Sequence, residues 1–146
     1  INMAVILASS CLLGCECRYK GDGCKCDALI KLAESNTIIG VCPEQMGGLP
    51  TPRDPAERQG DKVISCAGKD VTKAYTKGAE TALYFAKLNH VDFAVMKAKS
   101  PSCGKGLIYD GTFTGNKIPG NGVTVELLNA NGIPVFTEDE LDQLPL

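Results

Sequence analysis

Short runs of apolar residues recur along the chain, and stretches with helical spacing separate them. Residues 4–8, 37–41 and 92–98 each have the length and apolar content of a strand buried on both faces of a parallel sheet. A shorter run over residues 133–136 predicts a further strand. Strands that alternate with helices predict an α/β fold, which we expect to be a single three-layer αβα domain over residues 3–146. Its mainly parallel sheet is expected to have Rossmann-like topology.

The longest helical pattern covers residues 71–89, in which alanine and aromatic side chains return every three or four positions. Asp70 stands in front of this pattern and is expected to be the N-cap of the helix. Near the C-terminus, Thr137 and Glu140 have the spacing of a capping box and predict a short final helix.

Two segments are dominated by turn-forming residues instead. Residues 45–60 contain several prolines and a pair of adjacent glycines, which predicts an irregular loop. Loops of this length in a compact domain are usually functional. Residues 107–115 hold Asp110-Gly111 between β-forming residues, which predicts a hairpin that turns at this dipeptide.

Composition and charge narrow the class of protein. Apolar residues make up 44% and charged residues 22%, so the chain can bury a core without disulfide bonds. A net charge of -2 argues against a binding surface for nucleic-acid polymers. No apolar run is long enough for a transmembrane helix, and no basic region precedes the first apolar run, so we expect neither a membrane span nor a secretory signal. Residues 1–2 precede Met3 and are interpreted as an expression remnant.

Eight cysteines are the unusual feature of this composition. In a small secreted chain they would predict a disulfide framework, and that alternative stays open. The present chain is long enough to fold without such bonds and carries no export signal. A cytoplasmic location with metal binding or thiol chemistry is therefore the favoured interpretation.

Three of the cysteines follow predicted strands. Cys11, Cys42 and Cys103 each stand within a few residues of a strand end, beside serine, proline or glycine. The carboxyl ends of parallel strands lie at one edge of a sheet, where ligands bind. Three thiolates that meet at such an edge are suited to an iron–sulfur cluster. The alternative for each cysteine is a small buried hydrophobic residue.

Two other kinds of site compete with this interpretation. Cys15 with Cys17 and Cys24 with Cys26 form two Cys-x-Cys pairs in one glycine-rich segment, and four such thiolates could bind structural zinc. A catalytic cysteine–histidine dyad is less well supported by the sequence. The single histidine, His90, precedes a strand and is therefore expected at the opposite edge of the sheet.

Several polar residues accompany the strand-end cysteines. Glu44 lies two positions after Cys42 and could accept and deliver protons, although a surface or helix-capping role is an equal alternative. Ser100 and Ser102 flank a proline just before Cys103 and could bind a substrate or merely shape the turn. Arg53 and either Lys97 or Lys99 could neutralise an anion. The alternatives are an ordinary loop salt bridge for the arginine and a lysine whose stem packs on apolar surface while its amine stays in water.

The chain resembles a bacterial cysteine-rich family formerly of unknown function, which includes the iron–sulfur-dependent thiouracil desulfidase. The resemblance covers nearly the whole chain. It is carried by the segments Ser10-Cys11-Leu12-Leu13-Gly14, Cys17-Arg18-Tyr19, Cys42-Pro43-Glu44, Gly47-Gly48-Leu49-Pro50-Thr51-Pro52-Arg53, Lys99-Ser100-Pro101-Ser102-Cys103-Gly104 and Tyr109-Asp110-Gly111-Thr112-Phe113.

This resemblance implies a [4Fe-4S] cluster held by only three cysteines, with one iron left open. It assigns cluster binding to Cys11, Cys42 and Cys103, and Cys17 also falls on the family pattern as the candidate if one assignment is wrong. The remaining cysteines depart from the pattern, so a second metal in the glycine-rich segment stays open.

The resemblance also implies acid–base roles for Glu44 and Ser100, with Ser102 as a close neighbour. An open iron is thiophilic and would bind the sulfur of a thiocarbonyl, while Glu44 would activate water to attack the carbon. We therefore expect a non-redox desulfidase that acts on a small thiolated compound, of the thiouracil type. The alternatives are a non-catalytic zinc- or cluster-binding module and a thiol-redox protein. An aerobic preparation can lack the cluster or hold other species in its place.

Overall fold

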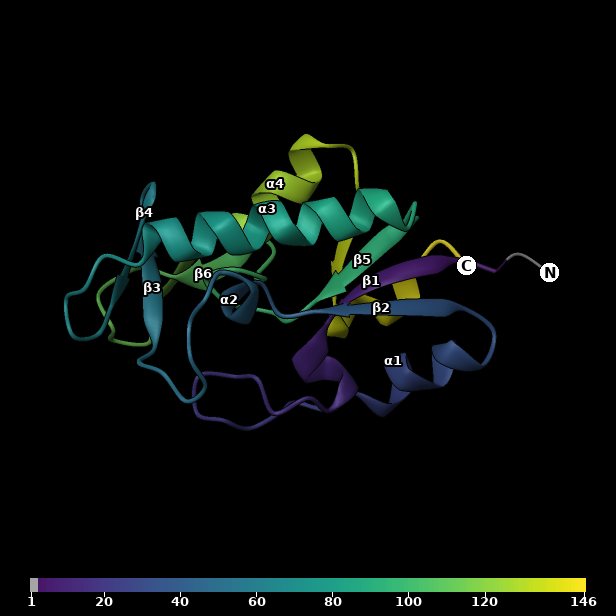
Figure 1. Cartoon of the computed structure of the whole chain (residues 1–146), viewed down its shortest axis with the longest axis horizontal. Helices are drawn as coiled ribbons and strands as arrows, with labels where there is room; N and C mark the ends of the chain where they lie inside the picture. Colours follow the sequence, from purple (N-terminus) through teal and green to yellow (C-terminus); the bar gives the residue numbers. More distant parts are fainter. Residues whose placement is uncertain (1–2) are drawn as a thin grey trace.

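The computed structural model describes residues 3–146, and the expected expression remnant at residues 1–2 lies outside the described residues. A four-stranded sheet forms its centre, and every neighbouring pair of strands in it is parallel. The predicted α/β class and parallel sheet are thereby confirmed (Figure 1). In spatial order the strands are β2 (Thr37–Val41), β1 (Val5–Ser9), β5 (Phe93–Met96) and β8 (Val135–Thr137).

Helices cover both faces of this sheet, because successive strand residues point to opposite sides. On one face, α3 (Thr72–Leu88) and α4 (Val123–Ala130) pack on a cluster that includes Leu7. On the other face, Leu29 of α1 (Asp27–Lys31) packs beside Ile6 of β1. The three-layer arrangement expected from the alternating pattern is therefore present.

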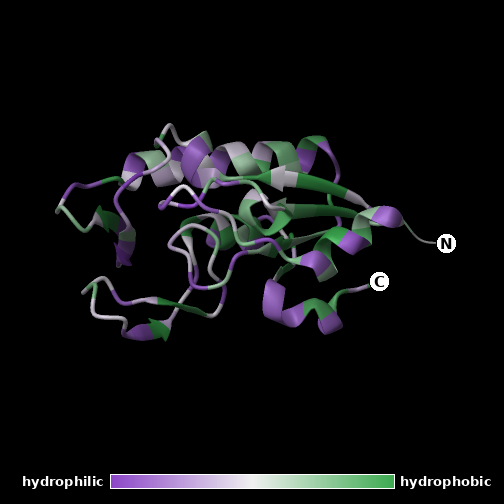
Figure 2. Ribbon diagram, turned by 90° about the horizontal axis from the view of Figure 1, so that it is seen from below, coloured by the Kyte–Doolittle hydropathy of each residue, from purple (hydrophilic) through white to green (hydrophobic). Residues whose placement is uncertain are grey.

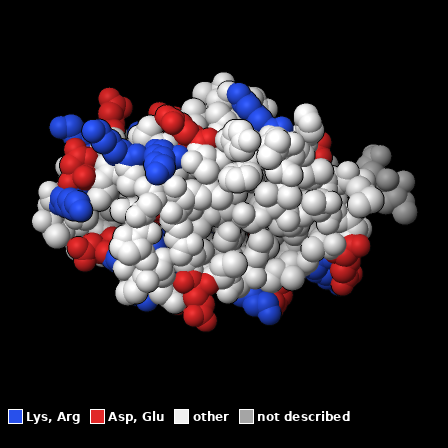
Figure 3. All heavy atoms as spheres, in the orientation of Figure 1, with Lys and Arg blue, Asp and Glu red and all other residues white. Residues whose placement is uncertain are grey.

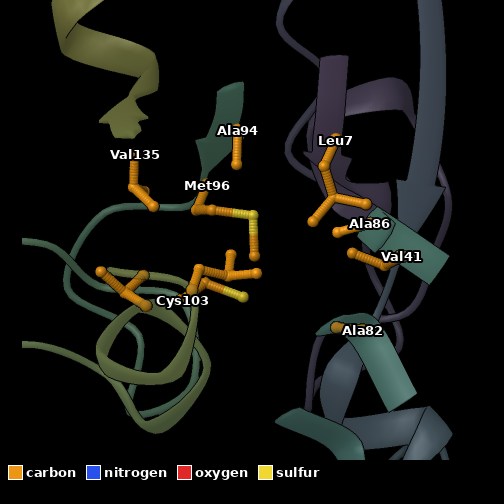
Figure 4. Close-up of a cluster of buried hydrophobic side chains, with 10 residues drawn as sticks. Leu7, Val41, Ala82, Ala86, Ala94, Met96, Cys103 and Val135 are labelled. Carbon is orange, nitrogen blue, oxygen red and sulfur yellow. The ribbon is translucent and has the colours of Figure 1, made fainter. Parts of the chain in front are cut away.

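The strands of the central sheet are largely hydrophobic, and they are mostly green in Figure 2. Side chains from the sheet, α3 and α4 form one continuous core on the first face. Figure 4 shows Met96 and Cys103 on the same side of this core, opposite Leu7 and Val41. One strand-end cysteine is thus built into the core and is only 5% exposed.

A short helix, α2 (Pro43–Met46), packs very closely on α3. A Cβ atom added to Gly78 would lie 1.8 Å from the Pro43 carbonyl oxygen, and one added to Gly47 would lie 1.9 Å from the Ala74 carbonyl oxygen. Only glycine allows the two backbones to approach in this way. The contact fixes the segment that follows β2, and with it the start of the candidate site.

The prediction of an irregular loop over residues 45–60 is wrong at both ends of this range. Its first residues belong to α2, and its last form β3 (Ala56–Gln59), which pairs antiparallel with β4 (Lys62–Ser65). Helix α2 is stabilised by its contact with α3, and strand β3 is stabilised by its pairing with β4. Neither partner is visible in the local sequence pattern, which is dominated by proline and glycine.

The expected hairpin over residues 107–115 exists in a different register. Strand β6 (Leu107–Tyr109) pairs with β7 (Lys117–Pro119), so the chain returns later than the Asp110-Gly111 turn predicts. The Asp110 carboxylate accepts hydrogen bonds from Thr112 and Asn116 and closes a wider loop between the two strands.

The expected capping residues do bond to the helix starts, but the helices do not begin at the expected residues. The first residue of α3 is Thr72 and its N-cap is Val71, while the Asp70 carboxylate accepts a hydrogen bond from the Thr72 N–H at 2.9 Å. The capping box of Thr137 and Glu140 is confirmed, at the start of the 3₁₀ helix Glu138–Gln143.

Charged side chains of both signs lie mixed on the face shown in Figure 3, mostly around its margins. The middle of that face is uncharged, and no continuous basic surface crosses it. Within residues 3–146, no helix combines the length and apolar character that a membrane span requires.

Candidate functional site

The candidate site lies at the carboxyl ends of the parallel strands. The chain places β2 on one side of β1 and then crosses to place β5 on the other, so the strand order reverses beside β1. Such reversal points leave a crevice in which ligands bind. A pocket of about 570 Å³ occupies this position, and residues of β3 and β6 also line it. Figure 1 shows both of these strands beyond the carboxyl ends of the sheet.

All three strand-end cysteines line this pocket. Cys11 lies in the 3₁₀ helix that follows β1, Cys42 is the N-cap residue of α2, and Cys103 lies in the turn after β5. Cys17 lines the same pocket from the glycine-rich segment. The exposed fractions of Cys11, Cys17 and Cys103 are 7%, 5% and 5%, so these thiols are shielded from bulk water.

Three of the four thiols that line the pocket have a raised pKa. A hydrogen bond with Cys11, together with burial, raises the pKa of Cys17 to about 11. A hydrogen bond with Cys17, together with burial, raises the pKa of Cys42 well above that of a free thiol. Burial raises the pKa of Cys103 to about 12, against hydrogen bonds from Ser102 and Ser9. These thiols are therefore neutral at physiological pH, and a bound cation would displace their protons.

The remaining cysteines lie outside the pocket. Cys15 and Cys66 are exposed, and the backbone N–H groups of Cys24 and Cys26 bond to the carbonyls of residues 11 and 12. Among residues 3–146, no three histidine, cysteine or acidic side chains are grouped tightly enough to hold a single metal ion. The Cys-x-Cys pairs therefore do not assemble the tetrahedral zinc site considered above. A cluster of several irons is larger than one ion, so its thiolates stand further apart.

The turn that carries Cys103 is held by the start of α4. The N–H groups of Val123 and Thr124 donate to the carbonyls of Pro101 and Ser102, at 2.9 Å each. A Cβ atom on Gly122 would lie 2.4 Å from the Ser102 carbonyl carbon, so glycine is needed for this contact. The free N–H groups of a helix start thus fix the backbone beside the thiol.

Glu44 lies at the centre of a hydrogen-bond network in the pocket wall. Its Oε1 accepts from Arg53 Nε at 3.0 Å and from the Tyr75 hydroxyl at 2.8 Å, while its Oε2 accepts from the Ser102 hydroxyl at 3.0 Å. The Arg53 and Glu44 side chains are 7% and 15% exposed. Burial and the Glu44 charge both raise the pKa of Tyr75, so its phenol stays neutral and donates.

The two serines form the next part of this network. The Ser100 and Ser102 hydroxyls lie 3.0 Å apart, and the Ser102 hydroxyl lies 3.4 Å from the Cys103 sulfur. Ser100 also accepts the N–H of Cys103 at 3.1 Å. Ser102 therefore connects the carboxylate to the thiol directly, whereas Ser100 shapes the turn and contacts Glu44 only through Ser102.

His90, Lys97 and Tyr75 differ in how they relate to the pocket. His90 is exposed and is not among the residues that line the pocket, as its position before β5 indicated. Lys97 lines the pocket and pairs with Glu138 at 2.8 Å. Burial is the largest single influence and lowers the pKa of Lys97, but the hydrogen bond to Glu138 and the Glu138 charge together leave the pKa raised. The sequence did not predict a role for Tyr75 in the site, because its position in the helical pattern is that of an apolar core residue.

Comparison with known proteins places the chain in a family. Residues 6–140 match the 2-thiouracil desulfurase family. The chain belongs to this family. The predicted resemblance is therefore confirmed, and the chain is a member of a family of sulfur-removing enzymes.

Two relatives of this desulfurase-family protein span almost its full length. A solved structure described as the "[4Fe-4S]-dependent thiouracil desulfidase TudS (DUF523Vcz)" is 44% identical, covers 98% of this chain and 95% of its own, and has a TM-score of 0.91. "Uncharacterized protein YbbK" of Bacillus subtilis (strain 168) is 42% identical over 150 residues, which are 96% of this chain and 99% of that protein.

Proposed function

We propose that this protein removes sulfur from a small thiolated compound of the thiouracil type, with a [4Fe-4S] cluster and without net redox change. The observation that carries this proposal is one shielded pocket that holds three strand-end thiols beside a buried carboxylate network. The family match and the printed description of the solved relative support the same chemistry.

The residues in the pocket fit such a cluster. Thiolates are the ligands that iron–sulfur clusters require, and four cysteine thiols line this pocket. We assign the binding to Cys11, Cys42 and Cys103, which three separate strands position. Cys17 is the reserve candidate, because it lines the same pocket and its carbonyl accepts a hydrogen bond from the Cys42 thiol at 3.8 Å.

When bound through three cysteines, the cluster supplies an open, thiophilic iron that polarises a C=S bond as a Lewis acid. Glu44 then acts on water. Its Oε1 accepts from two donors and its Oε2 from Ser102 alone, so Oε2 is the oxygen with room to take a proton from a water molecule that attacks the thiocarbonyl carbon. A carbonyl product and hydrosulfide result, which requires no oxidant.

The serines complete the proton path. Ser102 donates to Glu44 Oε2 and lies 3.0 Å from the Ser100 hydroxyl, so a proton taken by the carboxylate can be passed along two hydroxyls. Ser100 is thus proposed as the group nearer the substrate, with Ser102 as its connection to Glu44. The same path returns a proton to the substrate ring or to the leaving sulfur.

Anaerobic reconstitution with iron and sulfide tests this function. The protein is then expected to release hydrosulfide and the carbonyl product from 2-thiouracil or 4-thiouracil in equal amounts. Glu44→Gln should keep the iron and sulfide content and lower the rate by about 100- to 10,000-fold. A colourless protein with stoichiometric zinc, or a cluster-loaded protein that releases no sulfide from any thiopyrimidine, would contradict the proposal.

A further inference from the structure

Phe113 has an unusual backbone for a bulky residue. It lies in the loop between β6 and β7 with φ at +58°, in the left-handed region that favours glycine. Such a conformation is unfavourable and persists only when the surroundings enforce it. Strained residues of this kind gather at functional sites, and Phe113 lines the pocket described above.

The surroundings that enforce it come from β3. Glu57 Oε1 accepts hydrogen bonds from the backbone N–H groups of Gly111 at 3.0 Å and Phe113 at 3.2 Å. The Gln59 side chain donates to the Gly111 carbonyl at 2.9 Å. A Cβ atom on Gly111 would lie 2.8 Å from the Arg58 carbonyl oxygen, so the loop is seated tightly on this strand.

The loop is also braced from within. Asp110 Oδ1 accepts from both the N–H and the hydroxyl of Thr112, and Asp110 Oδ2 accepts from the Asn116 amide at 2.8 Å. These hydrogen bonds lower the pKa of Asp110 and keep its acceptor charge in place. Two independent sets of contacts therefore hold the Phe113 backbone in its strained state.

This bracing does not serve to bury the ring. Phe113 is 38% exposed and belongs to none of the hydrophobic clusters of the described chain. Tyr19 and Tyr109 line the same pocket, whereas the cysteine thiols enter it from the strand ends. The strain thus holds an accessible aromatic ring over the pocket instead of stabilising a core.

We infer that Phe113 is a specificity-determining residue whose ring packs on the face of the substrate heterocycle, held in place by Glu57. This inference rests on the proposed function, because it assigns the substrate class of the same pocket. A flat ring favours planar aromatic thiocarbonyl compounds over open-chain ones. An aromatic side chain stacked on a base contributes about 1–3 kcal/mol, which corresponds to about a 5- to 150-fold effect on affinity.

The test uses the cluster-loaded protein and compares Phe113→Leu with Phe113→Tyr. Turnover of 4-thiouracil and the dissociation constant of uracil, its ring product, are measured for each. Phe113→Leu is expected to raise the KM and the uracil Kd about tenfold while kcat and cluster content stay near those of the parent. Phe113→Tyr keeps a ring and should keep both constants within about twofold.

Ile118→Ala is the matched control, since Ile118 is an exposed apolar residue of the same hairpin that does not line the pocket. It should change neither constant. Glu57→Ala, which removes the acceptor that holds the loop, should also raise KM and the uracil Kd. Its kcat should change less than either of these constants.

Unchanged KM and uracil Kd in Phe113→Leu would overturn the inference, as would a fall in kcat and cluster content with both constants unchanged. A parent protein that binds uracil but releases no sulfide from 4-thiouracil would count against the proposed function. In that case the uracil Kd of Phe113→Leu would still decide whether the ring is a binding platform.

Discussion

The two groups of cysteines in this chain differ in where the fold places them. Cys11, Cys42 and Cys103 follow three parallel strands and line one shielded pocket. Cys15 and Cys66 are exposed and lie outside it. The two groups have the same chemistry in the sequence, so the difference arises from topology, because parallel strands bring their carboxyl ends together at one edge of the sheet. Cysteine count is therefore a poor guide to ligand number.

The largest expected effect comes from removing a strand-end thiol. Cys103→Ala should abolish cluster assembly and sulfide release, because the proposed cluster loses one of its three protein ligands. Iron and acid-labile sulfide content and the visible absorption spectrum measure the loss. Cys66→Ala is the matched control and should keep full cluster content, because Cys66 is exposed and is not among the residues that line the pocket. Equal loss in both variants would erase the distinction between the two groups.

The close contact that positions Cys42 provides a second test. Gly78→Ala adds a Cβ atom that would lie 1.8 Å from the Pro43 carbonyl oxygen, so α2 must move away from α3. We expect the free energy of unfolding to fall by at least about 2 kcal/mol. Denaturant unfolding measures this effect, and cluster content should fall with it. Lys77→Ala, at an exposed position of the same helix, should change the stability by less than about 0.5 kcal/mol.

A smaller effect is expected at the carboxylate network. Tyr75→Phe removes one of the two donors to Glu44 Oε1 and should lower kcat about tenfold, since a hydrogen bond to a charged group contributes about 1.5–3 kcal/mol. Cluster content should stay unchanged. Tyr84→Phe removes the hydroxyl of a tyrosine that is 62% exposed on the same helix and should have no effect. Unchanged kcat in Tyr75→Phe would remove this contact from the account.

Cluster assembly should depend on pH, because the thiol ligands must lose their protons to bind iron. Burial raises the pKa of Cys103, an assigned ligand, to about 12, so protons compete with iron for this thiol below that value. The competition weakens as pH rises, so apparent iron affinity during reconstitution should increase from pH 6 to pH 9. An iron affinity that falls or stays level over this range would contradict the assigned ligands.

The sequence predicted the parts of the site that depend on local pattern. Strand runs and the cysteines after them are visible as short apolar stretches that end at Cys11 or Cys42, and parallel topology then implies convergence. Tyr75 could not be found in this way, because the sequence shows only a tyrosine on an apolar helix face, which is typical of a core residue. Its hydrogen bond to Glu44 is visible only in the structure. Likewise, the need for glycine at Gly78 comes from the Pro43 backbone, a contact between segments far apart in the sequence.

The account's central claim is that three protein ligands leave one iron of the cluster open to the substrate sulfur. Mössbauer spectra of the reconstituted protein, recorded with and without 2-thiouracil, test this claim directly. The account predicts that the signal of one iron site changes on addition of the thiopyrimidine, while uracil, which lacks sulfur, leaves the spectrum unaltered. A spectrum that 2-thiouracil does not change would show that no iron is open to sulfur, and would contradict the claim.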